Sequence, residues 1–183
     1  MVATAEISRD REALLLAIAI ERHNSRLFRE WAMRFRPYDA AVSIFLEELA
    51  LEELAHEQDL LDIYRKYFGN NVPPAVPFPD ELLYFTKGLD AIKDHFFVIS
   101  SCVAQSLLEM AIKIERYTQQ FYLNLLAKTT DPELSAIYRT LGEFENGHEN
   151  ILLERLEAEQ ITSSEECMVS EKYASGEVQW DES

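Results

Sequence analysis

The sequence predicts an all-α protein: an antiparallel four-helix bundle with a long crossover between the second and third helices. Apolar residues make up 48% of the chain, while glycine occurs only five times, a composition that favours compact helical structure. Long stretches repeat their apolar residues with a helical period, and proline or glycine signals separate them. The 183 residues are enough for one domain with a sizeable core.

Clear start and stop signals bound the first two expected helices. Ser8 can cap a helix that runs to about Arg36, where Pro37 stops it. Asp39 can cap a second helix that runs to about Phe68, with Gly69 as its C-terminal stop. The loop between these two helices is short, so we expect them to be antiparallel neighbours.

A long crossover follows the first hairpin. The stretch 70–79 holds four prolines and cannot be regular helix, and a short helix is expected over 80–90. The third long helix is expected to start within 94–104 and to end near Lys128. This connection is long enough to reach back along the bundle.

The fourth long helix has a strong start signal. Asp131 is the expected cap, Pro132 takes the first helical position, and the helix runs to about Gln160. The chain therefore divides into a bundle over 1–160 and an acidic tail or loosely packed arm over 161–183. A four-helix bundle with one long crossover is the ferritin-like arrangement.

Charge and cysteine usage exclude several classes of protein. The net charge of −16 disfavours binding to nucleic acid and to anionic membranes. Cys102 and Cys167 lie far apart in the sequence, which excludes a cysteine-ligated zinc or iron–sulfur module and favours a reducing cytoplasm. The apolar run 13–20 is too short to span a bilayer, so we expect a cytoplasmic protein without a membrane segment. Cys102 is interpreted as a core residue.

The first and third helices carry the same motif. The sequence AIAIERHNSRLF begins at Ala17, and AIKIERYTQQFY begins at Ala111. The alignment of these two stretches places Glu21 opposite Glu115.

The second and fourth helices repeat as well. Glu53 and His56 form a Glu-x-x-His motif, and Glu145 and His148 form another at the matching place. One hairpin pattern, a glutamate on the first helix and Glu-x-x-His on the second, thus occurs twice. This repeat predicts a bundle with pseudo-two-fold symmetry.

These polar residues fall on the apolar faces of their helices, which predicts a metal site. Buried carboxylates without partners would be costly or would be forced to hold protons. Two divalent cations balance four carboxylates, and each imidazole adds one nitrogen; such oxygen-rich sites suit iron or manganese better than structural zinc. The predicted metal ligands are Glu21, Glu53, His56, Glu115, Glu145 and His148.

Other polar residues near these motifs have weaker signals. Tyr122 shares the helix face of the third-helix glutamate, so it is a candidate to hydrogen-bond a ligand or to donate a proton or electron; plain core packing is the alternative. Glu57 and Glu149 are interpreted as exposed acids on the helix flanks, with orientation of the ligands as the alternative. His23 and His95 are assigned no ligand role.

The second hairpin, LEMAIKIERYTQQFYLNLLAKTTDPELSAIYRTLGEFENGHENIL, resembles the rubrerythrin branch of the ferritin-like di-iron carboxylate superfamily, and the resemblance covers 7–159. It implies that the predicted ligands hold two iron ions, with manganese or a mixed pair as alternatives. It also implies that Glu53 and either Glu115 or Glu145 bridge the ions. A homodimer is expected on the same grounds.

Two departures from that branch shape the expected chemistry. The chain carries no four-cysteine rubredoxin domain, so the resemblance implies an external electron donor such as a rubredoxin or a reductase. Ile112 stands where peroxidase-type rubrerythrins have an extra glutamate, which disfavours their ligand-switching reduction of peroxide.

Three functions remain open from the sequence. The first is an oxidoreductase of the peroxidase or ferroxidase type, which reacts with H₂O₂ or O₂ or oxidises Fe(II) in oxidative stress or iron homeostasis. The second is a di-iron oxygenase that acts on an organic substrate and needs an apolar tunnel to the metals. The third is an iron storage or delivery protein without turnover.

Overall fold

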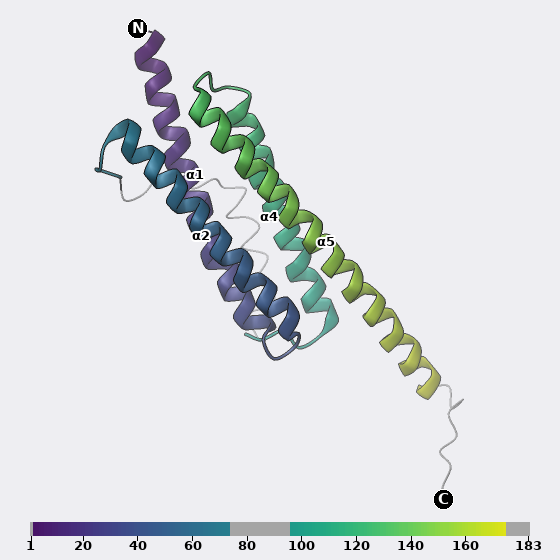
Figure 1. The fold of residues 1–183 in the computed structure, drawn as a ribbon. Helices are drawn as coiled ribbons and strands as arrows, with labels where there is room; N and C mark the ends of the chain where they lie inside the picture. The colour runs from purple at the N-terminus through teal and green to yellow at the C-terminus, as the bar shows by residue number, and fades with distance from the viewer. Residues whose placement is uncertain (1, 74–95, 175–183) are drawn as a thin grey trace, which may run out of the picture.

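Four long α-helices build the computed structural model, which describes residues 2–73 and 96–174; no strand occurs in those ranges (Figure 1). The predicted all-α class and four-helix bundle are confirmed. Not one of the described helices combines the length and the apolar character needed to cross a membrane. The helices are α1 (Val2–Phe35), α2 (Ala40–Phe68), α4 (Ser101–Leu126) and α5 (Pro132–Ala174).

The helices form two hairpins that lie side by side (Figure 1). α1 packs along α2, and α4 packs along α5. α2 and α4 run in the same direction. The end of the crossover between them is held where the N–H of Val98 donates to the carbonyl oxygen of Arg34 at 2.9 Å. The short helix expected over 80–90 lies outside the described residues.

The predicted caps define three of the helix ends. The carboxylate of Asp39 accepts hydrogen bonds from two N–H groups in the first turn of α2, and Asp131 does the same for α5. Gly69 ends α2 with a φ of 85°, a conformation that favours glycine. Ser100 caps α4, which places the start of that helix within the expected range.

Two predicted helix ends were wrong. α1 begins at Val2 rather than at Ser8, and α5 continues to Ala174 rather than ending near Gln160. Neither added segment contains a glycine or a proline, so nothing in it ends a helix, and the cap preference of one serine is too weak to do so. The interpretation of Cys102 as a core residue was also wrong, because its side chain is exposed.

The apolar core is divided into two clusters by a polar layer. The first cluster lies around Trp31, Phe35 and Leu46, and the second around Tyr64 and Tyr138. On every helix, buried glutamate, histidine, asparagine or threonine residues fall in sequence between the members of these two clusters. The polar layer is therefore closed on both sides by packed side chains that exclude water.

Candidate metal centre

The polar layer brings together all of the predicted ligands. Each long helix contributes one glutamate, and α2 and α5 each add one histidine. The four glutamates are 0% exposed, and the histidines are 5–6% exposed. The residues that meet in this layer are Glu21, Glu53, His56, Glu115, Glu145 and His148.

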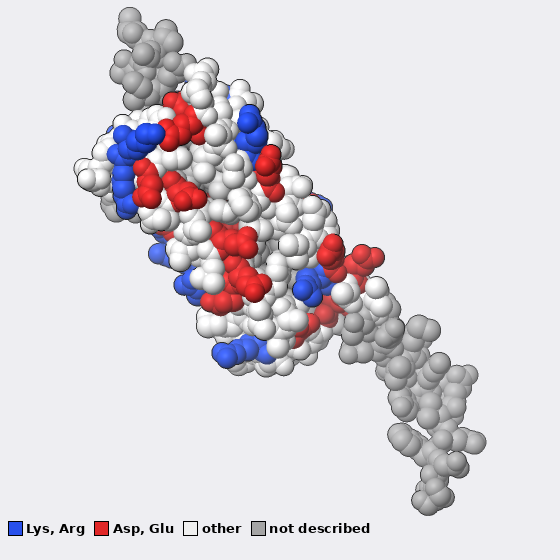
Figure 2. Space-filling view, viewed as in Figure 1, with Lys and Arg blue, Asp and Glu red and all other residues white. Residues whose placement is uncertain are grey.

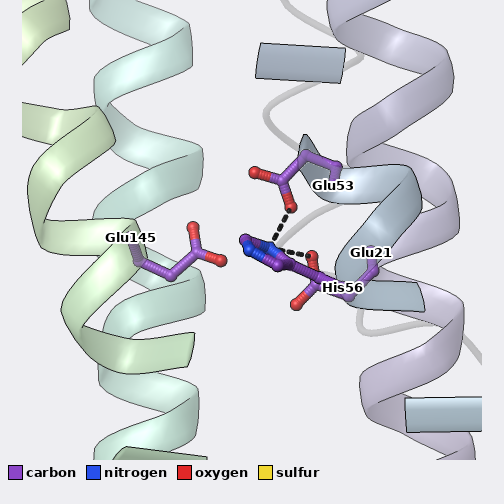
Figure 3. Close-up of side chains that lie close together, drawn as sticks. All are labelled: Glu21, Glu53, His56 and Glu145. Atoms are coloured by element: carbon purple, nitrogen blue, oxygen red, sulfur yellow. Dashed lines mark ion pairs between the residues drawn. The ribbon is translucent and has the colours of Figure 1, made fainter. Parts of the chain in front are cut away.

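These residues form two groups of four that could each hold a metal ion. In each group, one ligand atom per residue lies within 4.8 Å of all the others. We define the His56 group as Glu21, Glu53, His56 and Glu145, and the His148 group as Glu53, Glu115, Glu145 and His148. Figure 3 shows the His56 group, in which Glu145 points from α5 toward three side chains of the first hairpin. Glu53 and Glu145 belong to both groups.

Both histidines turn their Nδ1 atoms toward the carboxylates. The Nδ1 of His56 lies 3.6 Å from an oxygen of Glu53 and 3.8 Å from one of Glu21. The Nδ1 of His148 lies 3.2 Å from Glu53 and 3.6 Å from Glu115. The three-residue spacing of Glu-x-x-His produces this arrangement, because it places both side chains on one face of the helix.

Most of the inward atoms of this layer have no hydrogen-bond partner among the described residues. Both carboxylate oxygens of Glu53, Glu115 and Glu145 are unpartnered, as is the Nδ1 atom of each histidine. Buried polar atoms in natural proteins are nearly always paired, because an unpaired one loses its hydration without compensation. Oxygen and nitrogen atoms whose free lone pairs face one another in this way are the ligand set expected for cations.

The pKa values of these carboxylates also favour a cation site in the layer. Burial is the main cause that raises the pKa of Glu21, Glu115 and Glu145 well above the ordinary value, and neighbouring carboxylates add to it. Burial also acts to raise the pKa of Glu53, but interactions with Glu21 and both histidines outweigh it and hold that pKa well below its usual range. Without cations, the carboxylates of Glu21, Glu115 and Glu145 therefore retain protons.

The histidines are shifted in the opposite direction from that expected for buried bases. Burial lowers the pKa of His56, yet the carboxylates of Glu21 and Glu53 raise it to about 10. The pKa of His148 is raised to about 9, chiefly by Glu53. Protons thus occupy the layer where cations would otherwise balance the carboxylates.

Tyr122 reaches the centre from the opposite hairpin. Its hydroxyl donates a hydrogen bond to Glu21, and its side chain is fully buried. Burial, followed by the charge of Glu21, raises the pKa of this phenol well above its ordinary value, so it keeps its proton at neutral pH. Of the two alternatives open from the sequence, the structure therefore shows a contact with a predicted ligand.

Glu52 also contacts the centre, although the sequence did not single it out. Its carboxylate lies 2.9 Å from the Nε2 atom of His148, on the side of the ring that faces away from the layer. Counted along α2 alone, Glu52 falls beside the apolar face and looks like a solvated acid. Only the pairing of α2 with α5 reveals its role.

The interpretation of the two flank acids needs correction. Glu57 is buried and pairs with Arg22 at 2.7 Å. Glu149 is half-buried and pairs with Arg116 at 2.6 Å. Each pair joins the two helices of one hairpin, next to the predicted ligands. His23 lies on another face of α1, as expected, and His95 lies outside the described residues.

A surface cavity of about 430 Å³ reaches the His148 side of the centre. Its walls come from α5 and from Glu52 of α2, and they combine apolar and acidic side chains. The residues that line it are Glu52, Thr140, Glu143, Phe144, Gly147, His148 and Ile151.

Comparison with known proteins supports the fold. A hypothetical protein from Pyrococcus furiosus has a similar structure, with a TM-score of 0.61 and 22% sequence identity. The match covers 82% of this chain and 89% of that protein. No protein-family model matches the sequence. A search of curated proteins also found no match. The likeness to a solved structure thus establishes the helical architecture, and the buried Glu/His cluster establishes that the bundle could hold metal ions.

Proposed function

We propose that this chain is a rubrerythrin-like di-metal carboxylate protein that binds two iron ions and oxidises them with H₂O₂ or O₂. Manganese or a mixed pair is the alternative metal content. The observation that carries the proposal is the pair of four-residue groups that share Glu53 and Glu145 and whose inward atoms are buried and unpartnered. The oxygen-rich donor set with one imidazole per group suits iron or manganese.

The shared glutamates support an assignment of the carboxylates that would contact both ions. Glu53 and Glu145 belong to both groups, whereas Glu115 belongs only to the His148 group. Of the bridging alternatives that the resemblance left open, the grouping supports Glu53 with Glu145. Glu21 and Glu115 would each contact one ion, and charge balance follows because four carboxylates offset two divalent cations.

The residues around the site would donate protons and exclude bulk water. When bound, two Fe(II) ions would supply two electrons, which together with two protons balance the reduction of one H₂O₂ to two waters. Tyr122 holds a proton on its hydroxyl oxygen directly against Glu21, where it can be donated toward the site. The two apolar clusters on either side exclude bulk water. An external donor such as a rubredoxin or a reductase would return the electrons, and a homodimer is the proposed assembly.

Anaerobic loading with Fe(II) tests this function. We expect two irons per chain by elemental analysis. One equivalent of H₂O₂ should oxidise both, and the ultraviolet absorption of Fe(III) monitors this reaction. Glu53→Ala should reduce binding at both positions, because this residue serves both groups. A chain that takes up no iron, or whose bound Fe(II) resists both oxidants, would disprove the proposal.

Oxygenation of an organic substrate is the second candidate, and the cavity beside His148 favours it. Its volume of about 430 Å³ is in the range of small-molecule sites. In such a reaction, O₂, two electrons and two protons convert a C–H bond to C–OH and one water. Mass spectrometry of the organic extract of the purified protein tests this candidate: a bound apolar molecule supports it, and an empty extract with no oxidation of added fatty acids or aldehydes opposes it.

A further inference from the structure

The position that lies against each histidine is equivalent in the two halves of the repeat, but a different residue occupies it in each half. The repeat equates His56 with His148, and the residues four positions earlier are Glu52 and Phe144. α2 and α5 run antiparallel (Figure 1), so each of these residues lies against the histidine of the other helix. Glu52 is 2.9 Å from the Nε2 atom of His148. The ring of Phe144 stands with its centroid 5.0 Å from that of His56.

This difference affects how well each histidine can bind a cation. Nδ1 faces the carboxylates in both cases, so a cation bound there leaves the ring proton on Nε2. On His148 that proton is donated to the Glu52 carboxylate, which fixes the ring orientation and makes Nδ1 more basic. Phe144 has no acceptor atom to do the same for His56. Among the described residues, no carboxylate pairs with the outer nitrogen of His56.

A second asymmetry acts in the same direction. The repeat equates Tyr122 with Phe28, so only one of the two positions carries a hydroxyl. That hydroxyl donates to Glu21, a member of the His56 group. A donated hydrogen bond occupies a lone pair and withdraws charge from the carboxylate, which makes Glu21 a weaker ligand. The His56 group thus has the poorer donor set on two independent counts.

We propose that the two metal positions are unequal: the His148 group fills first, and Glu52 is the positioning residue that sets this order. The inference rests on the proposed di-metal function and extends it, because neither the repeat nor the ligand set alone distinguishes the two positions. An ordered centre would hold one ion firmly and exchange the other more readily.

Titration with Mn(II), monitored through the EPR signal of free Mn(II), tests the order in which the two positions fill. The wild-type chain should bind two ions in two resolved steps. Glu52→Ala should weaken the first step by about tenfold, the low end of the effect of such partners, because the Glu52 side chain is 54% exposed. Glu48→Ala removes the same charge from an exposed position one turn earlier on α2, and it should leave both steps unchanged.

A gain-of-function variant complements the loss. Phe144→Glu places a carboxylate at the pseudo-symmetric position, and since Phe144 is 47% exposed the bundle should tolerate it. We expect the second step to tighten until the two steps merge. His148→Ala should abolish the tighter step and His56→Ala the weaker one, which assigns the steps to the groups.

The outcomes separate the two claims. If the wild-type chain binds two Mn(II) ions with equal affinity, or if Glu52→Ala and Glu48→Ala behave alike, the order is refuted while the di-metal function stands. Loss of the weaker step in His148→Ala would also refute it. If the wild-type chain binds no Mn(II) or Fe(II), the proposed function fails and the order fails with it.

Discussion

Glu145 illustrates the conflict between folding and function within a single residue. Its carboxylate is fully buried, and neither oxygen has a partner among the described residues. Burial raises its pKa, so without a cation it folds as a neutral acid with unsatisfied polar atoms. Its presence opposes folding of the metal-free chain, and the proposed cation binding would explain why it is there.

A leucine at position 145 should therefore stabilise the metal-free protein. In the presence of a chelator, Glu145→Leu should raise the free energy of unfolding by about 1–3 kcal/mol, since it removes buried unpaired oxygens at similar volume. The same variant should lose metal binding. Urea denaturation measures the first effect, with the exposed Glu48→Leu as control. A fall in stability with chelator present would contradict this account of Glu145.

Tyr122 allows a test of proton supply without disturbance of the packing. Tyr122→Phe removes the hydroxyl that donates to Glu21, and the repeat already places a phenylalanine at the equivalent position 28. The variant should still bind two irons but oxidise them with peroxide on the order of 100-fold more slowly. Tyr138→Phe is the matched control, because that hydroxyl is buried without a hydrogen-bond partner among the described residues. Stopped-flow rates that are equal in both variants would exclude the proton-donor role.

At the scale of helices, one ion pair joins each hairpin beside the centre, and the two pairs differ in burial. The side chains of Arg22 and Glu57 are 37% and 10% exposed, and those of Arg116 and Glu149 are 55% and 15% exposed, so the second pair is moderately more open to water. Arg22→Ala leaves a carboxylate buried and unpaired, so it should cost about 1–3 kcal/mol. Arg116→Ala should cost less, because both members of that pair are more exposed. Equal losses in urea denaturation would show that burial does not control the strength of these pairs.

The helix ends that could be predicted were those set by a cap or stop residue that acts within one turn. The caps at Asp39 and Asp131 and the stop at Gly69 were predicted because each acts within one turn. The ends placed at Ser8 and Gln160 were wrong, because a single polar residue does not end a helix whose flanks lack glycine and proline.

The same distinction holds for the candidate site. The ligand positions followed from spacing within each helix and from the repeat, and the structure brings all of them together. Glu52 could not be found in this way, because its contact with His148 depends on the register between α2 and α5, which no single helix encodes. The burial of Glu57 was missed for a similar reason, since its partner Arg22 lies on a different helix.

For the molecule as a whole, the net charge of −16 is divided between the surface and the interior. On the face shown in Figure 2, acidic and basic side chains alternate with uncharged areas rather than forming one acidic sheet. Four of the acids are the fully buried glutamates of the polar layer between the two apolar clusters. Cation binding is therefore expected to change the stability of the entire bundle, because both hairpins contribute to that layer.

The pH dependence of stability should reveal this coupling. With a chelator present, the folded-state pKa values of His56 and His148 are raised from 6.5 to about 10 and about 9. A raised pKa means that the folded chain holds more protons than the unfolded chain, so this stability is fully present below pH 6.5 and is lost as pH rises toward 9–10. The raised pKa values of Glu21, Glu115 and Glu145 act with the same sign, and the lowered pKa of Glu53 matters only in acid.

We therefore expect the free energy of unfolding of the chelated protein to fall between pH 6.5 and 9 by about 1.4 kcal/mol per pH unit for each extra proton that the folded chain holds, and the Tm to fall with it. Saturating Mn(II) should reverse the trend. Bound cations replace those protons, so affinity rises with pH and the gap in Tm between loaded and chelated protein widens. Calorimetry across this range, with and without Mn(II), measures both curves. Parallel curves would mean that the six residues titrate independently of cation binding, and the layer would then not act as one coordinated centre.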